Sequence, residues 1–173
     1  MVASKYNIKP QDSMVLLKII ALKGKEWQQI TLAQELNMSQ SEISQSLQRS
    51  KYAQLLDFSG KKVNTIAFYE FLIHGIPYAF PQKPAAIVRG IATAHSASPI
   101  NKMIQSTEDY VWPYAKGNTR GQAIIPLYSS AIEASLKDSN LYELLSMVDV
   151  LRVGSTREKE IARLELKKRI LNE

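Results

Sequence analysis

The spacing of apolar positions predicts helices at both ends of the first 75 residues. Residues 10–23 carry apolar side chains on a wide stripe of a helix surface, and Asp12 or Ser13 is placed to cap its N-terminal end. Residues 64–74 form a second such segment, which Asn64 caps and which a glycine follows.

Two shorter helices are predicted between these segments, and each begins with the spacing of a capping box. In this device a Ser or Thr side chain binds the backbone three residues on, and an acidic or amide side chain returns the bond. Residues 31–36 begin at Thr31, and residues 39–50 begin at Ser39 with Glu42 in the answering position. The chain therefore places two helices close together, separated by a tight turn.

Beyond residue 50 the pattern changes three times. A Ser59-Gly60 turn between "LLDF" and "KKV" predicts a small β-hairpin. Residues 76–128 contain six prolines, which argues against long helices. In this segment "AIVRGIATA" and "YVWPYAKGNTRGQAIIPLY" have the composition of extended chain, and "KGNTRG" that of a hairpin tip. Residues 129–151 and 156–171 return to helical spacing.

The net charge of +6 is distributed unevenly. Basic residues outnumber acidic ones by nine to six in residues 1–75 and by five to two in residues 76–128. Residues 129–173 hold eight of each. An excess of positive charge favours a polyanionic partner, although a charge of this size also serves solubility alone.

Composition excludes several classes of chemistry. The chain has no cysteine, so disulfides, thiolate metal ligands and cysteine nucleophiles are ruled out. Its two histidines lie outside any acidic cluster, and neither a GxxxxGKS nor a GxGxxG phosphate loop is present. We therefore predict neither a metal nor a cofactor. No apolar run has the length of a membrane span and no leader resembles a signal peptide, so a cytoplasmic location is expected.

The stretch "LAQELNMSQSEISQSL", residues 32–47, has the layout of a helix-turn-helix. On the first helix and in the turn, the inward positions are apolar: Leu32, Ala33, Leu36 and Met38. On the second helix, Ile43 and Leu47 form the inner face. The outer face then carries five uncharged polar residues: Gln40, Ser41, Ser44, Gln45 and Gln48.

These outer side chains suit contacts with base pairs. A Gln amide pairs with the N6 and N7 edge of adenine, and a Ser hydroxyl donates to or accepts from several bases. Phosphate contacts position a protein on DNA without distinguishing sequences, and we expect them around this face. The residues assigned to phosphates are Thr31, Arg49, Lys51, Lys61 and Lys62. We assign Glu42 to the helix cap rather than to a base.

This pattern resembles the helix-turn-helix of bacterial transcription regulators. With the preceding helix and the following basic hairpin, residues 10–75 are similar to the winged helix-turn-helix domain of MarR-type and related families. Two departures are Asn37, where such turns most often have glycine, and a very short wing. The whole chain also resembles a group of small helix-turn-helix proteins found beside nucleotidyltransferase-like toxin genes.

The pattern and the resemblance together predict a mainly α protein with a small β component. Residues 1–75 would form a winged helix-turn-helix DNA-binding domain, residues 76–128 a mixed extended segment, and residues 129–173 a helical region that dimerises. The expected function is sequence-specific binding of double-stranded DNA by a homodimeric bacterial transcriptional repressor. The first alternative is an antitoxin that covers the active site of a partner toxin, and the second is an enzyme acting through the middle segment.

Two features of the middle segment carry candidate chemistry. Lys116 and Arg120 lie at the expected hairpin tip, where they would form a second basic finger on DNA or RNA. The aromatic residues nearby would either stack on bases or belong to the core, namely Trp112, Tyr114 and Tyr128. His95-Ser96 invites comparison with a base and nucleophile, but adjacent residues rarely aim their side chains at each other, so we favour a histidine satisfied within a loop.

Overall fold

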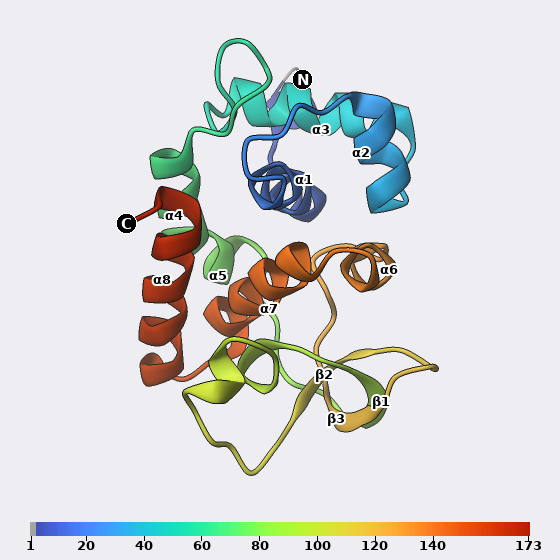
Figure 1. Cartoon of the computed structure of the whole chain (residues 1–173), viewed down its shortest axis with the longest axis vertical. Coiled ribbons are helices and arrows are strands. Elements are labelled where there is room, and N and C mark those ends of the chain that lie inside the picture. Colours follow the sequence, from blue (N-terminus) through green and yellow to red (C-terminus); the bar gives the residue numbers. More distant parts are fainter. Residues whose placement is uncertain (1–2) are drawn as a thin grey trace.

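Helices make up most of the chain, and a small sheet accompanies them, as the sequence predicted. The computed structural model describes residues 3–173 and contains eight α-helices and three strands in that range (Figure 1). The helices are α1 (Pro10–Ala21), α2 (Gln29–Leu36), α3 (Gln40–Tyr52), α4 (Thr65–His74), α5 (Ile76–Ala79), α6 (Ala131–Leu136), α7 (Ser139–Val153) and α8 (Thr156–Leu171). The strands are β1 (Ile87–Ala92), β2 (Tyr110–Pro113) and β3 (Thr119–Ala123). Short 3-10 helices are η1 (Ala3–Tyr6), η2 (Ala94–Ser96) and η3 (Ile100–Lys102).

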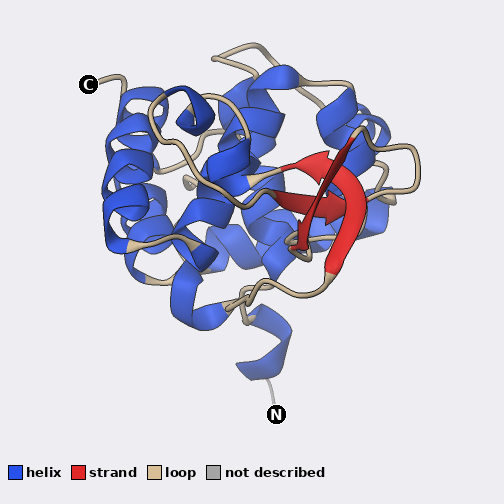
Figure 2. Ribbon diagram, turned by 90° about the horizontal axis from the view of Figure 1, so that it is seen from below, coloured by secondary structure: helices blue, strands red, loops and turns tan. Residues whose placement is uncertain are grey.

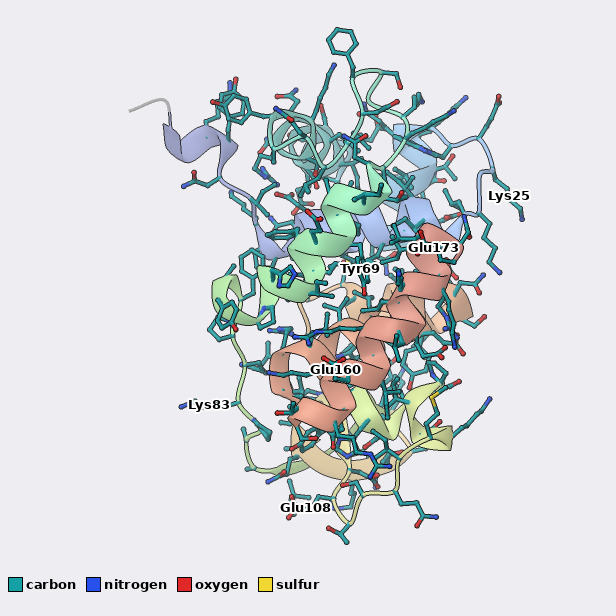
Figure 3. The ribbon with its side chains drawn as sticks, turned by 90° about the vertical axis from the view of Figure 1, so that its left-hand side faces the viewer. Lys25, Tyr69, Lys83, Glu108, Glu160 and Glu173 are labelled. Carbon is teal, nitrogen blue, oxygen red and sulfur yellow. The ribbon has the colours of Figure 1, made fainter. Side chains whose placement is uncertain are left out.

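The helices and the sheet are stacked along the long axis of the molecule in an order that differs from their order in the chain. In Figure 1, α2 and α3 lie at one end, α1 and then α7 come next, and the sheet lies at the opposite end. Figure 2 views the molecule from the sheet end, with the helices behind the strands. Figure 3, turned by 90°, keeps Lys25 near the α2–α3 end and Glu108 at the sheet end. Helices α4 and α8 pack together along one side.

Helix α1 lies at the centre of a single hydrophobic cluster. Its residues 14–17 are fully buried, because α3 packs on one side of the helix and α7 on another. The same cluster includes residues of the middle segment, such as Trp112, and residues of α7 and α8. Apolar burial of this kind supplies the main driving force for folding. The core therefore extends through all three segments that the sequence distinguishes.

The apolar stripe of α8 packs within the chain. Ala162, Leu166 and Ile170 are buried in the cluster, and α8 contacts both α4 and α7. Leu164 remains 60% exposed on the other side of the helix. This stripe, in the region that the sequence assigned to dimerisation, is therefore covered by other helices of the same chain.

Two charged side chains of α1 are buried, and both are paired. Asp12 accepts two hydrogen bonds from the Arg49 guanidinium of α3, at 2.7 and 2.8 Å. Lys18 binds Glu35 of α2 at 2.8 Å and Asp138, just before α7, at 2.7 Å. Burial alone would lower the pKa of Lys18, but the two carboxylates outweigh it and raise that pKa above its usual value. These pairs join the helix-turn-helix to α1 and to the C-terminal half.

Each strand of the sheet pairs with both others. Strand β1 is antiparallel to β2 and to β3, which therefore run parallel to each other. A Cβ at Gly90 would lie 1.9 Å from the Trp112 carbonyl oxygen, so only glycine fits this close approach. The carboxylate of Asp149 in α7 anchors the sheet by accepting bonds from Trp112 Nε1 and Thr93 Oγ1, both at 2.7 Å. Burial raises the pKa of Asp149, although the Arg152 guanidinium opposes this shift.

Two predicted N-cap residues are wrong, although the first helix begins at residue 10 as predicted. Helix α1 begins after Lys9, and the Asp12 carboxylate accepts the Lys9 backbone N–H at 2.8 Å, so neither Asp12 nor Ser13 is the N-cap. Helix α2 begins at Gln29, which places Thr31 inside the first turn rather than at the cap.

Three further predictions need correction. The hairpin expected around Ser59-Gly60 is reduced to one bridge, Leu56↔Val63. The "KGNTRG" segment, residues 116–121, leads into β3 and supplies its first three residues, but it is not a hairpin tip, because β2 and β3 run parallel to each other and both pair antiparallel with β1. The helix expected over 129–151 is interrupted before α7, since the Asp138 side chain accepts the backbone N–H of Leu141 at 3.1 Å and so starts a new helix.

Arg49→Met should destabilise the fold, because it leaves the buried Asp12 carboxylate without its ionic partner. We expect the free energy of unfolding, measured by urea titration at neutral pH, to fall by about 3–5 kcal/mol. Asp12→Leu combined with Arg49→Met should lose less than Arg49→Met alone, since both charges are then removed. Arg120→Met, at an exposed position, is the control. A loss of only about 1 kcal/mol for Arg49→Met, the size of a surface pair, would contradict the buried pairing.

Candidate nucleic-acid interface

The turn between α2 and α3 is tight and left-handed. Asn37 ends α2 with φ 51° and ψ 46°, a region that Asn tolerates better than most side chains. Met38 follows and is buried in the core. Lys137, just after α6, donates to the side-chain oxygen of Asn37 at 3.0 Å and so holds the turn from outside. This conformation explains how Asn37 stands where such turns most often have glycine.

A capping box starts α3, as the sequence predicted. Ser39 Oγ accepts the Glu42 backbone N–H at 3.1 Å, and Glu42 Oε2 accepts the Ser39 backbone N–H at 2.8 Å. The other oxygen of Glu42 accepts the Tyr128 hydroxyl at 2.5 Å. The Tyr128 hydrogen bond and the capping bonds lower the pKa of Glu42 and, through the same contact, raise that of Tyr128. Glu42 therefore faces the protein and is not placed as a base contact.

The outer face of α3 carries uncharged polar side chains. Successive helix residues turn by about 100°, which places Ser41, Gln45 and Gln48 away from buried Ile43 and Leu47. Gln40, in the first turn, lies on the same side of the helix as Leu47. In Figure 1, α3 lies at the end of the molecule. The amide of Gln45 donates to Ser41 Oγ at 3.1 Å. All five predicted base contacts lie on α3, and all are exposed except half-buried Ser44: Gln40, Ser41, Ser44, Gln45 and Gln48.

Arg49 is not available for a phosphate. Its side chain is 5% exposed and its guanidinium is bound to Asp12, so the prediction that Arg49 contacts DNA is corrected. Local sequence patterns could not predict this ion pair, because Asp12 lies 37 residues earlier in the chain. Lys51, at the end of the same helix, is exposed, and its Nζ lies 5.3 Å from the centre of the Phe58 ring.

Asp57 shapes the loop between α3 and α4, residues 53–64, which we call the wing loop because the sequence predicted a wing there. Its carboxylate accepts the backbone N–H groups of Lys61 and Lys62, each at 3.0 Å, and the Ser59 hydroxyl at 2.8 Å. The bond from Lys62 contributes most to lowering the pKa of Asp57. Gly60 takes φ +76° at the turn, where other side chains would be strained. Hydrogen bonds to Asp57 therefore stabilise the loop, although its two limbs share only one β-bridge.

Lys61 ties the wing loop to the connection between α1 and α2. Its Nζ donates to the Trp27 carbonyl oxygen at 3.1 Å and lies 4.4 Å from the centre of the Trp27 ring. In return, Trp27 Nε1 donates to the Lys61 carbonyl oxygen at 3.2 Å. Thr31, Lys61 and Lys62 line one open groove of about 1510 Å³. The structure thus brings together three of the predicted phosphate residues.

A segment that the sequence analysis missed lies against α3. Tyr6 of η1 stacks on Tyr52 at the end of α3, with ring centroids 4.3 Å apart. Lys5 and Tyr6 form a recess with Gln45 and Gln48. The few residues before α1 have no periodicity that would have predicted this contact, which adds a cation beside the polar face.

Lys116 and Arg120 do not join this surface. Both are exposed, but they lie in and just before β3, at the opposite end of the molecule from α3 (Figures 1 and 2). Trp112 is 1% exposed and bonds Asp149, so it belongs to the core, as one of the two interpretations held. Tyr128 is bound to Glu42 and is likewise not placed to stack on a base.

His95 and Ser96 bind different parts of the backbone. His95 is buried, and its Nε2 lies 2.7 Å from the Glu108 carbonyl oxygen, so this nitrogen carries the proton. Ser96 Oγ accepts the Tyr110 backbone N–H at 2.9 Å. The His95 ring also packs edge-on against the Tyr110 ring. Each side chain therefore stabilises the segment that leads into β2.

Comparisons with known proteins identify no relative. No family model, curated protein or solved structure matches the chain. Within residues 3–173, acidic and histidine side chains do not gather into a group that would hold a metal ion. Across the same described part of the chain, no helix is long and apolar enough to cross a membrane.

Glu42→Gln should remove a pH-dependent contribution to stability. The folded-state pKa of Glu42 lies below its ordinary value of 4.5, so the contribution is present above that pH and is lost as pH falls through the folded pKa. In urea titrations, the variant should be less stable than wild type near neutral pH, and the difference should shrink on acidification to about pH 3. A difference that stays constant would contradict the contacts assigned to Glu42.

Proposed function

We propose that the protein binds double-stranded DNA sequence-specifically through α3 and acts as a bacterial transcriptional repressor, with the wing loop as a short wing. One observation carries the proposal: an exposed, uncharged, hydrogen-bonding face lies on a helix that follows a tight left-handed turn. The major groove, about 12 Å wide, admits an α-helix, and Gln and Ser side chains match its base edges.

The surroundings of this face suit a duplex. Lys51, near the end of α3, and Lys62, in the wing loop, are exposed, and Thr31 lines the same groove as Lys62. Lys5 of η1 lies beside Gln45. Cations that flank a neutral polar helix face supply the phosphate contacts that position a helix in the groove.

The proposal includes binding as a homodimer, because helix-turn-helix regulators commonly bind as dimers to two half-sites about one DNA turn apart. The apolar stripe of α8 is buried within the chain, so the pairing would use another surface. Sedimentation of the protein alone and with DNA would measure the number of copies. A single copy on DNA would remove the dimer while leaving the role of α3 intact.

Gln45→Ala should weaken binding to the cognate site and relax the preference at one base position. We expect a loss of about 1–3 kcal/mol in binding free energy, measured by titration of a duplex selected from random sequences. Gln105→Ala, at an exposed position in the connection before β2, is the matched control and should bind as wild type does. If Gln45→Ala keeps both the affinity and the selected sequence, α3 is not the contacting helix.

Lys62→Ala should weaken binding to all DNA sequences alike. Each phosphate that is neutralised contributes about −0.9 to the slope of log K against log salt, so the slope should become shallower by about this amount. Lys116→Ala removes the same charge at the sheet end and should leave the slope unchanged. Equal effects of the two substitutions would mean that the net charge acts generically. A wild-type protein without salt-dependent DNA binding would favour a protein-only role, such as an antitoxin.

A further inference from the structure

Phe58 differs from the other apolar side chains at the surface. It is 92% exposed, more than any other large hydrophobic residue in residues 3–173. It belongs to the wing loop, which extends past α3 at that end of the molecule (Figures 1 and 3). One exposed apolar residue is common and needs no explanation by itself. Phe58 is distinguished from such residues by the hydrogen-bonded shape of its loop and by the positive charge near its ring.

Hydrogen bonds within the wing loop fix its shape without help from the Phe58 side chain. The Asp57 backbone N–H donates to the Lys62 carbonyl oxygen at 2.7 Å, and the Gly60 N–H donates to the Asp57 carbonyl oxygen at 2.9 Å. The backbone and side chain of Asn64 close the base of the loop through two further bonds to carbonyl oxygens. The loop therefore holds the ring in solvent at a defined place, which limits the ordering that binding requires.

One positive charge lies close to the Phe58 ring, since Lys51 Nζ lies 5.3 Å from its centre. Lys61 and Lys62 follow later in the same loop, where the Lys61 amine binds the Trp27 carbonyl oxygen and Lys62 is exposed. The Asp57 carboxylate is bonded to the loop backbone. An exposed apolar ring beside a cation, on a loop that carries two further lysines, fits a partner with apolar faces between chains of negative charge, and stacked bases between two phosphate chains have this chemistry. A membrane surface would need a broader apolar face than one ring.

Resting on the DNA binding proposed above, we propose that Phe58 inserts as a wedge between stacked base pairs beside the site that α3 contacts. Apolar wedges that enter from the minor groove partly unstack one step and kink the duplex, by about 20–90° in known cases. Pyrimidine–purine steps such as TA and CA unstack most easily. The wing loop would therefore add a preference for such a step, in addition to the preference set by the Gln and Ser face.

The test uses the full-length protein and a duplex of about 30 base pairs that carries the most enriched sequence from a selection. 2-Aminopurine, placed in turn at each flanking position, brightens when its step unstacks, and fluorophores at the two ends report bending. With wild type, one flanking step should brighten and the ends should approach each other. Phe58→Ala should lose both signals and bind about tenfold more weakly. It should keep the base preference that Gln45 confers.

Two controls separate the wedge from other roles of the loop. Tyr78→Ala removes an exposed aromatic of α5, 82% exposed, and should behave as wild type does. Phe58→Leu keeps an apolar wedge and should retain part of the bend. Wild-type binding at a selected site with no unstacking, no bend and no effect of Phe58→Ala would overturn the wedge and leave the α3 assignment standing. Absence of any selected site would overturn both proposals, and loss of anionic-vesicle binding alone in Phe58→Ala would overturn the wedge in favour of a lipid surface.

Discussion

Two buried charges on α1 determine how the helix-turn-helix is held on the rest of the molecule. Asp12 and Lys18 are 0% and 5% exposed, and a buried charge without a partner costs several kcal/mol, so each requires an opposite charge at hydrogen-bond distance. The partners come from three other elements: Arg49 from α3, Glu35 from α2, and Asp138 from the start of α7. Helix α3 cannot tilt on α1 without breaking the Asp12 pair, and α2 cannot leave the C-terminal half without breaking the Lys18 pairs.

These ion pairs fix the position of α3, and therefore of its polar face, relative to the rest of the molecule. The Tyr128 bond to Glu42 and the Lys137 bond to Asn37 add contacts from the C-terminal part of the chain to the start of α3 and to the turn. On one side of α3 the wing loop is closed by Asp57. Side chains that contact bases act most effectively when rigid elements hold them in place. Contacts from the buried core and from the C-terminal part of the chain therefore hold the proposed interface in place.

Local patterns in the sequence predicted the features that depend on neighbouring residues. The Ser39 and Glu42 capping box and the polar face of α3 both follow from spacings of a few residues. The predictions that failed concern contacts between residues that are far apart in the sequence. Arg49 looked like a phosphate contact because its partner lies 37 residues away, and the "KGNTRG" segment looked like a hairpin because β1, with which both flanking strands pair, comes earlier in the chain. The exposure of Phe58 could not be predicted from the sequence, because it depends on the hydrogen bonds within the wing loop.

Sequence-specific binding by α3 is best tested by a selection of genomic DNA fragments with the purified wild-type protein, sequenced after selection at a low and a high salt concentration. Such binding should enrich one motif at both salt concentrations, because base contacts persist when phosphate contacts are screened. A palindromic motif would also show that two copies bind together. Fragments enriched without a shared motif, or enrichment lost entirely at the higher salt, would contradict sequence-specific binding by α3.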